Sequence, residues 1–179
     1  MPIYTKRGDK GKTDIFESKC FTKIRVDKDD IRLQIIGTID ELNSCLGIIV
    51  SLLKDEKEKQ FINRIQKDLF LMNSLIAGIK NIKFSKNKVN YLEEKIDSLE
   101  KELPKLTNFI LPGGSMVSCY LHLARSITRR AERNIVSFAK ENKFNLNVLI
   151  FINRLSDLFF VLSRWNNFNR GIKETIWKK

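Results

Sequence analysis

The amino-acid sequence predicts an all-α fold, an up-and-down bundle of five helices that follows an irregular N-terminal loop. The chain of 179 residues contains only three prolines and eight glycines, so long segments run without a break. Apolar residues recur at three- and four-residue steps in five stretches, which is the period of one face of an α-helix. The connections are mostly short, which is typical of antiparallel neighbours. We expect helices at about 39–54, 57–78, 87–103, 115–141 and 146–168.

The start of the first helix is predicted from a glycine and a capping pattern. Residues 31–36 alternate between apolar and polar side chains, which suits an extended entry segment or a single strand, and Gly37 interrupts them. Thr38 stands three residues before Glu41, a pair whose side chains can hydrogen-bond each other's free backbone N–H groups. The helix is therefore predicted to start close to Thr38.

The fourth stretch carries a cluster of charged side chains. Arg125, Arg129, Glu132 and Arg133 recur at helical spacing, so they project from one face. Guanidinium groups around a carboxylate suit a polyphosphate, with or without a metal ion. A solvated charged face is the alternative, because such faces are common on helices.

The fifth stretch is strongly apolar but contains polar residues on one side. Asn153, Asp157 and Arg164 share that side of the helix. Polar groups within such a helix need partners. We expect these partners in the charged cluster of the fourth stretch or in the N-terminal loop.

Residues 3–26 are predicted to form a loop with little regular structure. Between Tyr4 and Thr13 the chain places two glycines among several cations and two threonines. Glycines let backbone N–H groups converge on an anion, and lysine and threonine side chains add donors. The pattern is not a Walker A motif, which would need glycine in place of Lys6 and a buried strand before it. Phosphate binding and a mobile basic terminus both fit this loop.

A second loop precedes the fourth stretch. An apolar run that begins at Phe109 enters a Pro-Gly-Gly turn, and Ser115 can cap the helix that follows. The two glycines allow a close approach of the backbone, so a ligand contact at Phe109 and a tight connection between helices are both open.

Composition limits the class of protein and of partner. The formal net charge of +12, from 33 Lys and Arg against 21 Asp and Glu, favours an anionic partner, and nucleic acid, a nucleotide triphosphate and an anionic membrane all fit. We expect no apolar run as long as a membrane span and no secretory signal, and therefore a cytoplasmic protein. The cysteines, Cys20, Cys45 and Cys119, have neither zinc-site spacing nor the even number of a disulfide framework, and the only histidine, His122, is interpreted as structural.

Neither an internal repeat nor a linker divides the sequence, so we expect a single domain over residues 1–179. It would comprise an N-terminal loop and entry segment (1–37), a helical bundle (38–168) and a basic, frayed tail (169–179).

Four segments together resemble the PduO-type family of ATP:cob(I)alamin adenosyltransferases. They are IYTKRGDKGKT, GTIDELNSCLG, FILPGGS, and RSITRRAERNI with INRLSDLFFVLSR, in this order over residues 3–165. The resemblance implies a ferritin-like helical bundle and a homotrimer with ATP at each subunit interface. It implies that the enzyme transfers the 5′-deoxyadenosyl group of ATP to the cobalt of cob(I)alamin and releases triphosphate. It also implies an electron-donating reductase and an acceptor enzyme as partners, with neither nucleic acid nor a membrane.

The same resemblance implies roles for particular residues. Arg129 would be the main triphosphate contact, and Arg125 would pair with Asp40 in assembling the interface site. Phe109 would lie beside the corrin and exclude the lower ligand of the cobalt, and Mg²⁺ would bind through ATP with help from Glu132 and Asn153. The ATP-binding residues implied by the motifs are Thr5, Lys6, Arg7, Gly8, Thr13, Lys23, Arg129, Arg130, Ala131, Glu132, Arg133 and Asn153.

The sequence departs from the family in its first motif. Arg7 stands where the family usually has threonine, Lys12 stands where a smaller or neutral residue is usual, and Asp14-Ile15-Phe16 is not the common continuation. Two other hypotheses remain. One is a basic helical nucleic-acid-binding module, although no groove-reading motif or base-stacking platform is recognisable. The other is a protein that binds ATP or a corrinoid without transferring the adenosyl group.

Overall fold

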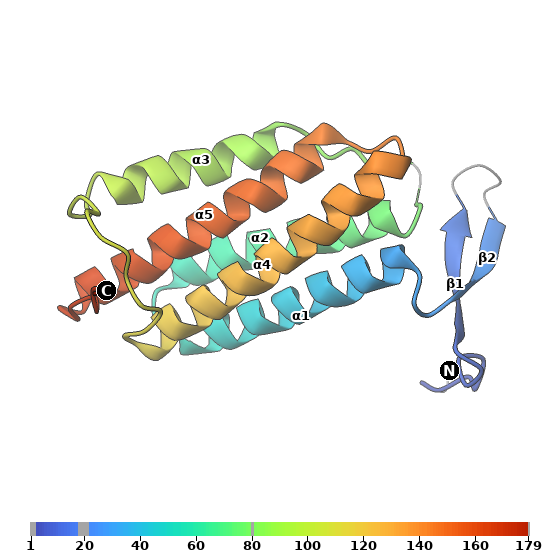
Figure 1. Cartoon of the computed structure of the whole chain (residues 1–179), viewed down its shortest axis with the longest axis horizontal. Coiled ribbons are helices and arrows are strands. Elements are labelled where there is room, and N and C mark those ends of the chain that lie inside the picture. The colour runs from blue at the N-terminus through green and yellow to red at the C-terminus, as the bar shows by residue number, and fades with distance from the viewer. Residues whose placement is uncertain (1–2, 18–21, 80, 179) are drawn as a thin grey trace.

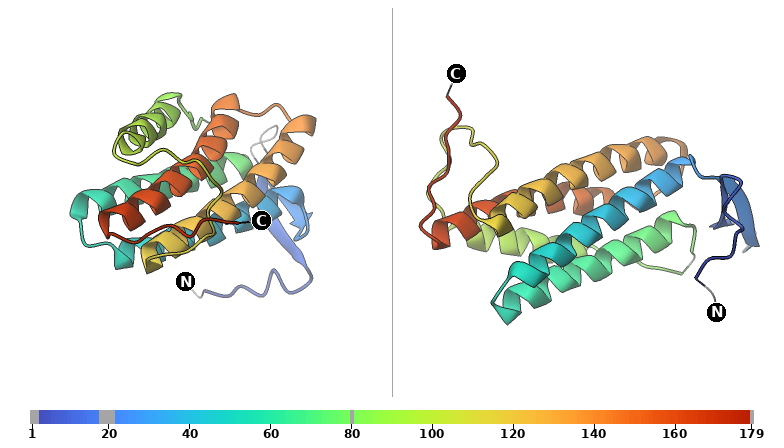
Figure 2. Two further views of the ribbon diagram at one scale, coloured as in Figure 1. Left: turned by 60° about the vertical axis from the view of Figure 1, so that its left-hand side comes forward. Right: turned by 90° about the horizontal axis from the view of Figure 1, so that it is seen from below.

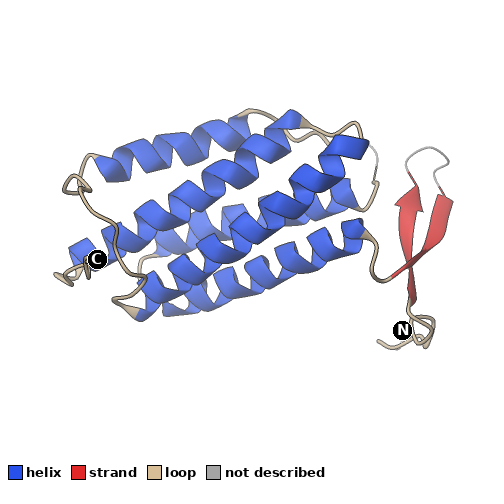
Figure 3. Ribbon diagram, viewed as in Figure 1, coloured by secondary structure: helices blue, strands red, loops and turns tan. Residues whose placement is uncertain are grey.

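The computed structural model describes residues 3–17, 22–79 and 81–178, in which five helices form a bundle beside a small two-stranded sheet (Figure 1, Figure 3). The all-α prediction is confirmed, and the last four helices begin and end within a few residues of the expected positions. The elements in chain order are β1 (Lys12–Glu17), β2 (Thr22–Asp27), α1 (Ile31–Leu52), α2 (Glu56–Ile76), α3 (Asn87–Glu100), α4 (Met116–Glu141) and α5 (Leu146–Asn169).

The core lies between the apolar stripes of the helices. α4 packs against α1 and α5, while α2 covers α1 and α3 covers α5 (Figure 1, Figure 2). The stripes predicted by helical periodicity face inward, and burying each large apolar side chain stabilises the fold by about 1.5–3 kcal/mol. Buried members of these stripes include Leu42, Leu46 and Ile49 of α1, Leu69 and Met72 of α2, Leu92 of α3, Leu121 and Ile135 of α4, and Leu155 and Phe159 of α5.

The predicted start of the first helix is wrong, because α1 already begins at Ile31. Asp30 is its N-cap residue and accepts a hydrogen bond from the backbone N–H of Arg32 at 2.8 Å. Thr38 lies inside the helix and donates its hydroxyl proton to the carbonyl of Gln34. The buried stripe of α1 starts before Gly37, and its burial outweighs the cost of about 1 kcal/mol for an internal glycine.

The expectation of little regular structure in residues 3–26 is also wrong, because β1 and β2 form an antiparallel hairpin. Thr13 lies opposite Val26, and Phe16 lies opposite Lys23. Apolar and polar residues alternate along β2 from Lys23 to Asp27, and Ile15 of β1 turns inward with only 5% of its surface exposed. Residues 18–21, which include Cys20, fall outside the described residues.

The C-terminal tail is ordered rather than frayed. The backbone N–H of Leu111 donates to the carbonyl of Thr175, and that of Trp177 donates to the carbonyl of Phe109, both at 2.8 Å. An antiparallel bridge lies between these two bonds. The segment before α4 therefore gives the tail a backbone partner, which a reading of the tail's composition alone does not reveal.

The hairpin and the tail lie at opposite ends of the bundle. The N-terminal loop and the hairpin project beyond the start of α1, whereas the loop that leads into α4 and the tail lie at the other end (Figure 1, Figure 2). We call these the hairpin end and the tail end of the bundle.

Two helices have the length and composition of a membrane span, contrary to the expectation from sequence. They are α1, with a mean hydropathy of 1.5, and α5, with a mean hydropathy of 1.6. Of the residues in these apolar windows, 39% in α1 and 50% in α5 are buried inside the bundle. Core helices of soluble proteins have the same properties, so this observation is weak evidence for a membrane.

Candidate active site

The middle of α4 presents unpaired cations on its surface. Arg129 and Arg133 are exposed and make no hydrogen bond or ion pair with the described residues. Arg130, also exposed, forms an ion pair with Glu41 of α1. Ala131 is fully buried, which places it behind these arginines and away from the surface that a ligand would touch. We call Arg129, Arg130 and Arg133 the arginine face.

One predicted contact between the last two helices is present beside this face. The side-chain amide of Asn153 on α5 donates to the carboxylate of Glu132 on α4 at 2.8 Å. The next residue, Arg154, donates to Glu93 of α3 at 2.8 Å and approaches Asn153 and Asp157 at 3.5 Å. Helical periodicity correctly predicted that Asn153 contacts the charged cluster. The ion pair from Arg154 to α3 was not predicted, because only the folded chain brings α3 alongside α5.

Arg125 has an unusual environment for a cation. Its Nε atom is buried without a hydrogen-bond partner among the described residues, and its guanidinium lies 5.9 Å from the ring centre of Phe160. Burial, and to a smaller extent the charge of Arg129, lower the pKa of Arg125 below its usual range. A half-buried guanidinium whose Nε atom has no partner, next to unpaired arginines, favours the approach of an anion.

The predicted pairing of Arg125 with Asp40 does not occur within one chain. Asp40 is exposed on α1, and no hydrogen bond or ion pair joins it to Arg125 in the described part of the chain. The neighbouring acid of the same motif, Glu41, instead pairs with the arginine face through Arg130.

The N-terminal loop is a tight, exposed turn in front of the hairpin. The backbone N–H of Gly11 donates to the carbonyl of Gly8 at 3.2 Å, and Lys6 adopts a positive φ of 57°. Arg7 pairs with Asp14 of β1 at 2.8 Å. Thr5 and Lys6 are exposed and have no side-chain partner among the described residues.

Thr13 and Lys23 are placed by the hairpin that follows this loop. Thr13 stands on β1 and Lys23 on β2, so the strand pairing fixes one relative to the other. The ammonium group of Lys23 lies 5.7 Å from the ring centre of Phe16, a distance at which a cation is attracted to an aromatic face. This role of Phe16 depends on the strand pairing and is not visible in its sequence context.

Phe109 is displayed at the tail end, with 82% of its surface exposed. Its loop is held by α5, because the side chain of Asn167 accepts from the N–H of Ser115 and donates to the carbonyl of Gly113, both at 3.0 Å. Asn166 accepts a hydrogen bond from the hydroxyl of Ser115 at 2.6 Å. An exposed aromatic ring thus stands on a loop whose base is fixed.

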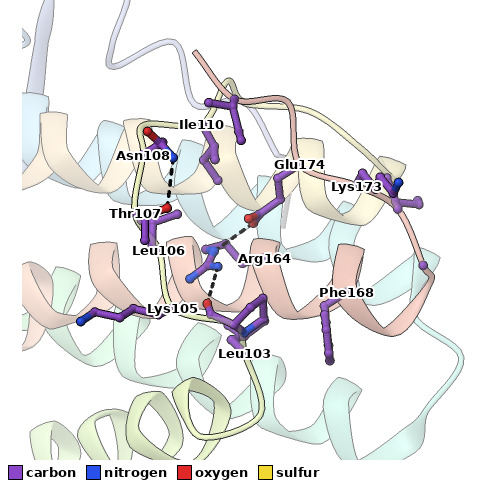
Figure 4. Close-up of a pocket in the computed structure, with 14 residues that line it drawn as sticks. Leu103, Lys105, Leu106, Thr107, Asn108, Ile110, Arg164, Phe168, Lys173 and Glu174 are labelled. Atoms are coloured by element: carbon purple, nitrogen blue, oxygen red, sulfur yellow. Dashed lines mark hydrogen bonds and ion pairs between the residues drawn. The ribbon is translucent and has the colours of Figure 1, made fainter. Parts of the chain in front are cut away.

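Arg164 also holds this loop, contrary to the expectation that its partners lie in the charged cluster or in the N-terminal loop. Figure 4 shows it between the tail and the loop, donating to Glu174 at 2.9 Å and to the carbonyl of Pro104 at 3.0 Å. These contacts border a cavity of about 490 Å³ that Leu106, Ile110 and Phe168 help to line (Figure 4). Residue 164 lies too far along α5 from Asn153 to reach the same partners, because each residue adds about 1.5 Å of rise.

The predicted site residues therefore fall into three groups within one chain. The N-terminal loop lies at the hairpin end, the arginine face with Asn153 lies along the middle of the bundle, and Phe109 lies at the tail end (Figure 1). The described residues contain no group of three or more His, Cys, Asp or Glu side chains that could hold a metal ion. Glu132 lies beside the arginine face and offers a carboxylate that suits a cation arriving with a polyphosphate, whereas the carboxylate of Glu41 is already paired with Arg130.

Comparison with known proteins gives a family for this arrangement. A family model described as cobalamin adenosyltransferase matches residues 3–166. The corrinoid adenosyltransferase of Bacillus subtilis (strain 168) is 39% identical over 100% of this chain and 93% of its own length. The corrinoid adenosyltransferase MMAB of Homo sapiens is 36% identical over 99% of this chain and 73% of its own length.

Solved structures agree with the sequence relatives. A phenylalanine-to-alanine variant of the PduO-type ATP:corrinoid adenosyltransferase from Lactobacillus reuteri, complexed with cobalamin and ATP, has a TM-score of 0.90 and 38% identity, and covers 99% of this chain and 100% of its own. An arginine-to-lysine variant of the same type, complexed with ATP, has a TM-score of 0.88 and 39% identity, and covers 98% of this chain and 100% of its own. With its family model, its relatives and its fold in agreement, the chain belongs to the cobalamin adenosyltransferase family.

Proposed function

We propose that this protein is an ATP:corrinoid adenosyltransferase, which transfers the 5′-deoxyadenosyl group of ATP to the cobalt of cob(I)alamin and releases triphosphate. The observation that carries the proposal is the arginine face of α4, with its unpaired Arg129 and Arg133, in a chain that matches the family from residue 3 to residue 166. Relatives of known structure bind cobalamin and ATP.

The reaction needs alignment and charge stabilisation more than a protein nucleophile. The electron pair of Co(I) forms the new bond to C5′, the bond from C5′ to oxygen breaks, and its electrons leave with the triphosphate. Arg129 and Arg133 stabilise the charge that develops on the triphosphate, and the loop from Thr5 to Gly8 encloses the phosphates. Phe109 gives the corrin a dry apolar face that keeps a lower ligand away from the cobalt.

Mg²⁺ enters this scheme as a companion of ATP. Glu132 provides an oxygen ligand of the kind that Mg²⁺ prefers, and Asn153 orients it through their 2.8 Å hydrogen bond. When bound, the ion neutralises part of the triphosphate charge. The remaining neutralisation falls to the arginine face and to Lys23.

A homotrimer with sites between subunits is supported by the separation of the site groups. The N-terminal loop and Phe109 lie at opposite ends of one bundle, so neighbouring copies are needed to bring the loop that holds ATP next to the Phe109 that holds the corrinoid. In the same arrangement Asp40 meets Arg125 across the interface and gives its unpaired Nε atom a partner. The protein works in the cytoplasm, where a reductase supplies the electron for Co(I) and an acceptor enzyme takes the product.

The activity is tested by incubating the full chain with ATP, Mg²⁺ and chemically reduced cobalamin under strict anaerobiosis. We expect adenosylcobalamin, seen by its absorbance spectrum, and an equal amount of triphosphate. Absence of corrinoid-dependent triphosphate release would refute the proposal. ATP binding without product would favour a binding protein, and salt-sensitive binding to DNA or RNA in place of ATP would favour the nucleic-acid module.

The shared site has its own test, which pairs two variants that are each expected to be inactive. Lys6→Ala impairs the loop and Arg129→Ala impairs the arginine face. In mixed trimers some interfaces combine an intact loop with an intact arginine face, so co-expression is expected to restore part of the activity. A mixture as inactive as its parts would place each site within one chain.

A further inference from the structure

The C-terminal end of α2 touches the hairpin through backbone atoms. The N–H of Phe16, on β1, donates to the carbonyl of Ala77 at 3.1 Å. The next residue, Gly78, has a φ of +89°, and a Cβ atom on it would lie only 2.1 Å from the carbonyl oxygen of Phe16. Since no side chain fits in that space, glycine is required for β1 to reach α2.

The same contact leads to a residue of the proposed ATP site. Phe16 is the register partner of Lys23, and its ring lies under the Lys23 ammonium group at 5.7 Å. Further along β1, the pairing with β2 fixes Thr13, and the N-terminal loop comes directly before this strand. A shift of Phe16 at the end of α2 would therefore move Lys23, Thr13 and the loop together.

We propose that Gly78 is a positioning residue for ATP, because it seats β1 on the end of α2 and thereby sets the place of Lys23 and of the N-terminal loop. This inference rests on the proposed function, in which that loop encloses the triphosphate. Gly78 itself does not touch the nucleotide.

The chain contains a matched control for this position. α2 ends with the N–H of Gly78 bonded to the carbonyl of Leu75 and that of Ile79 bonded to the carbonyl of Ser74. α5 ends in the same way, with the N–H of Gly171 bonded to Phe168 and that of Ile172 bonded to Asn167. Gly171 also has a positive φ, of +65°, but no atom lies within 4 Å of the position that its Cβ would take.

Asparagine is the best substitute at both positions, because it tolerates this backbone conformation at the end of a helix. Gly78→Asn and Gly171→Asn therefore impose a similar local strain, and only Gly78→Asn places an atom against β1. Steady-state kinetics with ATP and with cob(I)alamin, together with hydrogen exchange of the Phe16 amide, distinguish the effects of the two variants.

We expect Gly78→Asn to raise the KM for ATP by about tenfold or more, since small displacements of binding groups are costly, and to leave the KM for cob(I)alamin unchanged. Exchange at Phe16 should become faster. Gly171→Asn should change neither the KM for ATP nor this exchange rate. An unchanged KM for ATP in Gly78→Asn, or an equal rise in Gly171→Asn, would overturn the inference.

Two further measurements keep the test decisive. If Gly78→Asn does not fold, Phe16→Leu removes the ring below Lys23 and is expected to weaken ATP binding, measured by calorimetry; unchanged binding would overturn the inference. If Lys23→Ala weakens ATP binding while Gly78→Asn does not, the inference fails and the proposed function stands. A wild-type protein that binds no ATP would instead refute the proposed function.

Discussion

At the hairpin end, β1 touches the bundle through the backbone of Phe16 and Ala77, and the loop in front of it relies on exposed ion pairs such as Arg7 with Asp14. At the tail end, buried side chains of α5 hold both the Phe109 loop and the tail, through Asn167 and Arg164. Exposed ion pairs contribute little to stability, whereas buried hydrogen bonds are costly to break. Substitutions at the hairpin end are therefore expected to leave the free energy of unfolding nearly unchanged while they weaken ATP binding. Substitutions at the tail end should lower the free energy of unfolding and also weaken corrinoid binding.

The largest effect is expected between the two ends, on the arginine face. Arg129→Ala removes an exposed cation without a protein partner, so the melting temperature should stay within about 2 °C of wild type. Turnover should fall by about 100-fold or more, because a donor to the departing triphosphate is lost. Anaerobic kinetics and calorimetric scans measure the two quantities. Normal turnover would exclude Arg129 from the site.

A change at the tail end should have the largest effect on stability. Asn167→Ala leaves the N–H of Ser115 and the carbonyl of Gly113 without their partner, so we expect the free energy of unfolding to fall by about 2–4 kcal/mol. The KM for cob(I)alamin should rise and the KM for ATP should not. Urea titration and kinetics check this, with the exposed neighbour Asn169→Ala as control. Equal stabilities of the two variants would contradict the comparison.

A smaller effect is expected from His122, which lies on α4 close to the tail and is 5% exposed. Burial, then the charge of Arg125, lower its pKa below the ordinary value of about 6.5, although Glu174 opposes this. His122 therefore binds a proton more readily in the unfolded chain than in the folded one. The contribution of neutral His122 to the free energy of unfolding is complete above pH 6.5 and is lost as the pH falls toward the lowered pKa of the folded state.

Because His122 is the only histidine, its contribution can be isolated. Urea denaturation between pH 7.5 and 5.5, at two or more intermediate values, should show the free energy of unfolding falling with pH in the wild type. The slope should be flatter in His122→Leu. Parallel pH profiles for the two proteins would show that another group is responsible.

The smallest effect is expected at the hairpin end. Arg7→Thr removes the ion pair with Asp14, in which the Arg7 side chain is 66% exposed. The free energy of unfolding should change by no more than about 0.5 kcal/mol, because exposed ion pairs are weak. ATP affinity should change by no more than a few-fold. A loss of stability similar to that of Asn167→Ala would remove the distinction between the ends.

Much of the fold could be predicted because burial follows a helical period. The apolar residues that recur at helical spacing in the predicted helix 115–141, from Val117 to Ile135, are buried, and four of the five helices begin and end close to the expected residues. The errors fell where local signals were misleading. Gly37 was interpreted as a break, but the buried stripe continues through it, and the Thr38 and Glu41 pattern matched a capping box without being one.

The hairpin and the tail show a different limit of sequence analysis. β1 and β2 are short and pair locally, but the seat of β1 on Ala77 joins residues that are far apart in the chain. The tail pairs with Phe109 and Leu111 across more than sixty positions of sequence, and Arg164 is drawn to the carbonyl of Pro104, sixty positions away, as well as to the nearby Glu174. The hydrogen bond between Asn153 and Glu132 could be predicted, because both residues lie on helices whose packing faces the sequence defines. The place of Phe109 relative to the other groups could not be predicted, because it depends on how copies of the chain associate.

The seat of β1 on Ala77 also constrains how the protein can change during evolution. One residue inserted into or deleted from α2 would turn its last carbonyl group by about 100° and shift it by about 1.5 Å along the axis. The N–H of Phe16 could then no longer reach its acceptor, even if every residue of the nucleotide site were retained. Functional relatives should therefore vary more in the sequence of α2 than in its length, and length changes should gather in the connections between other helices.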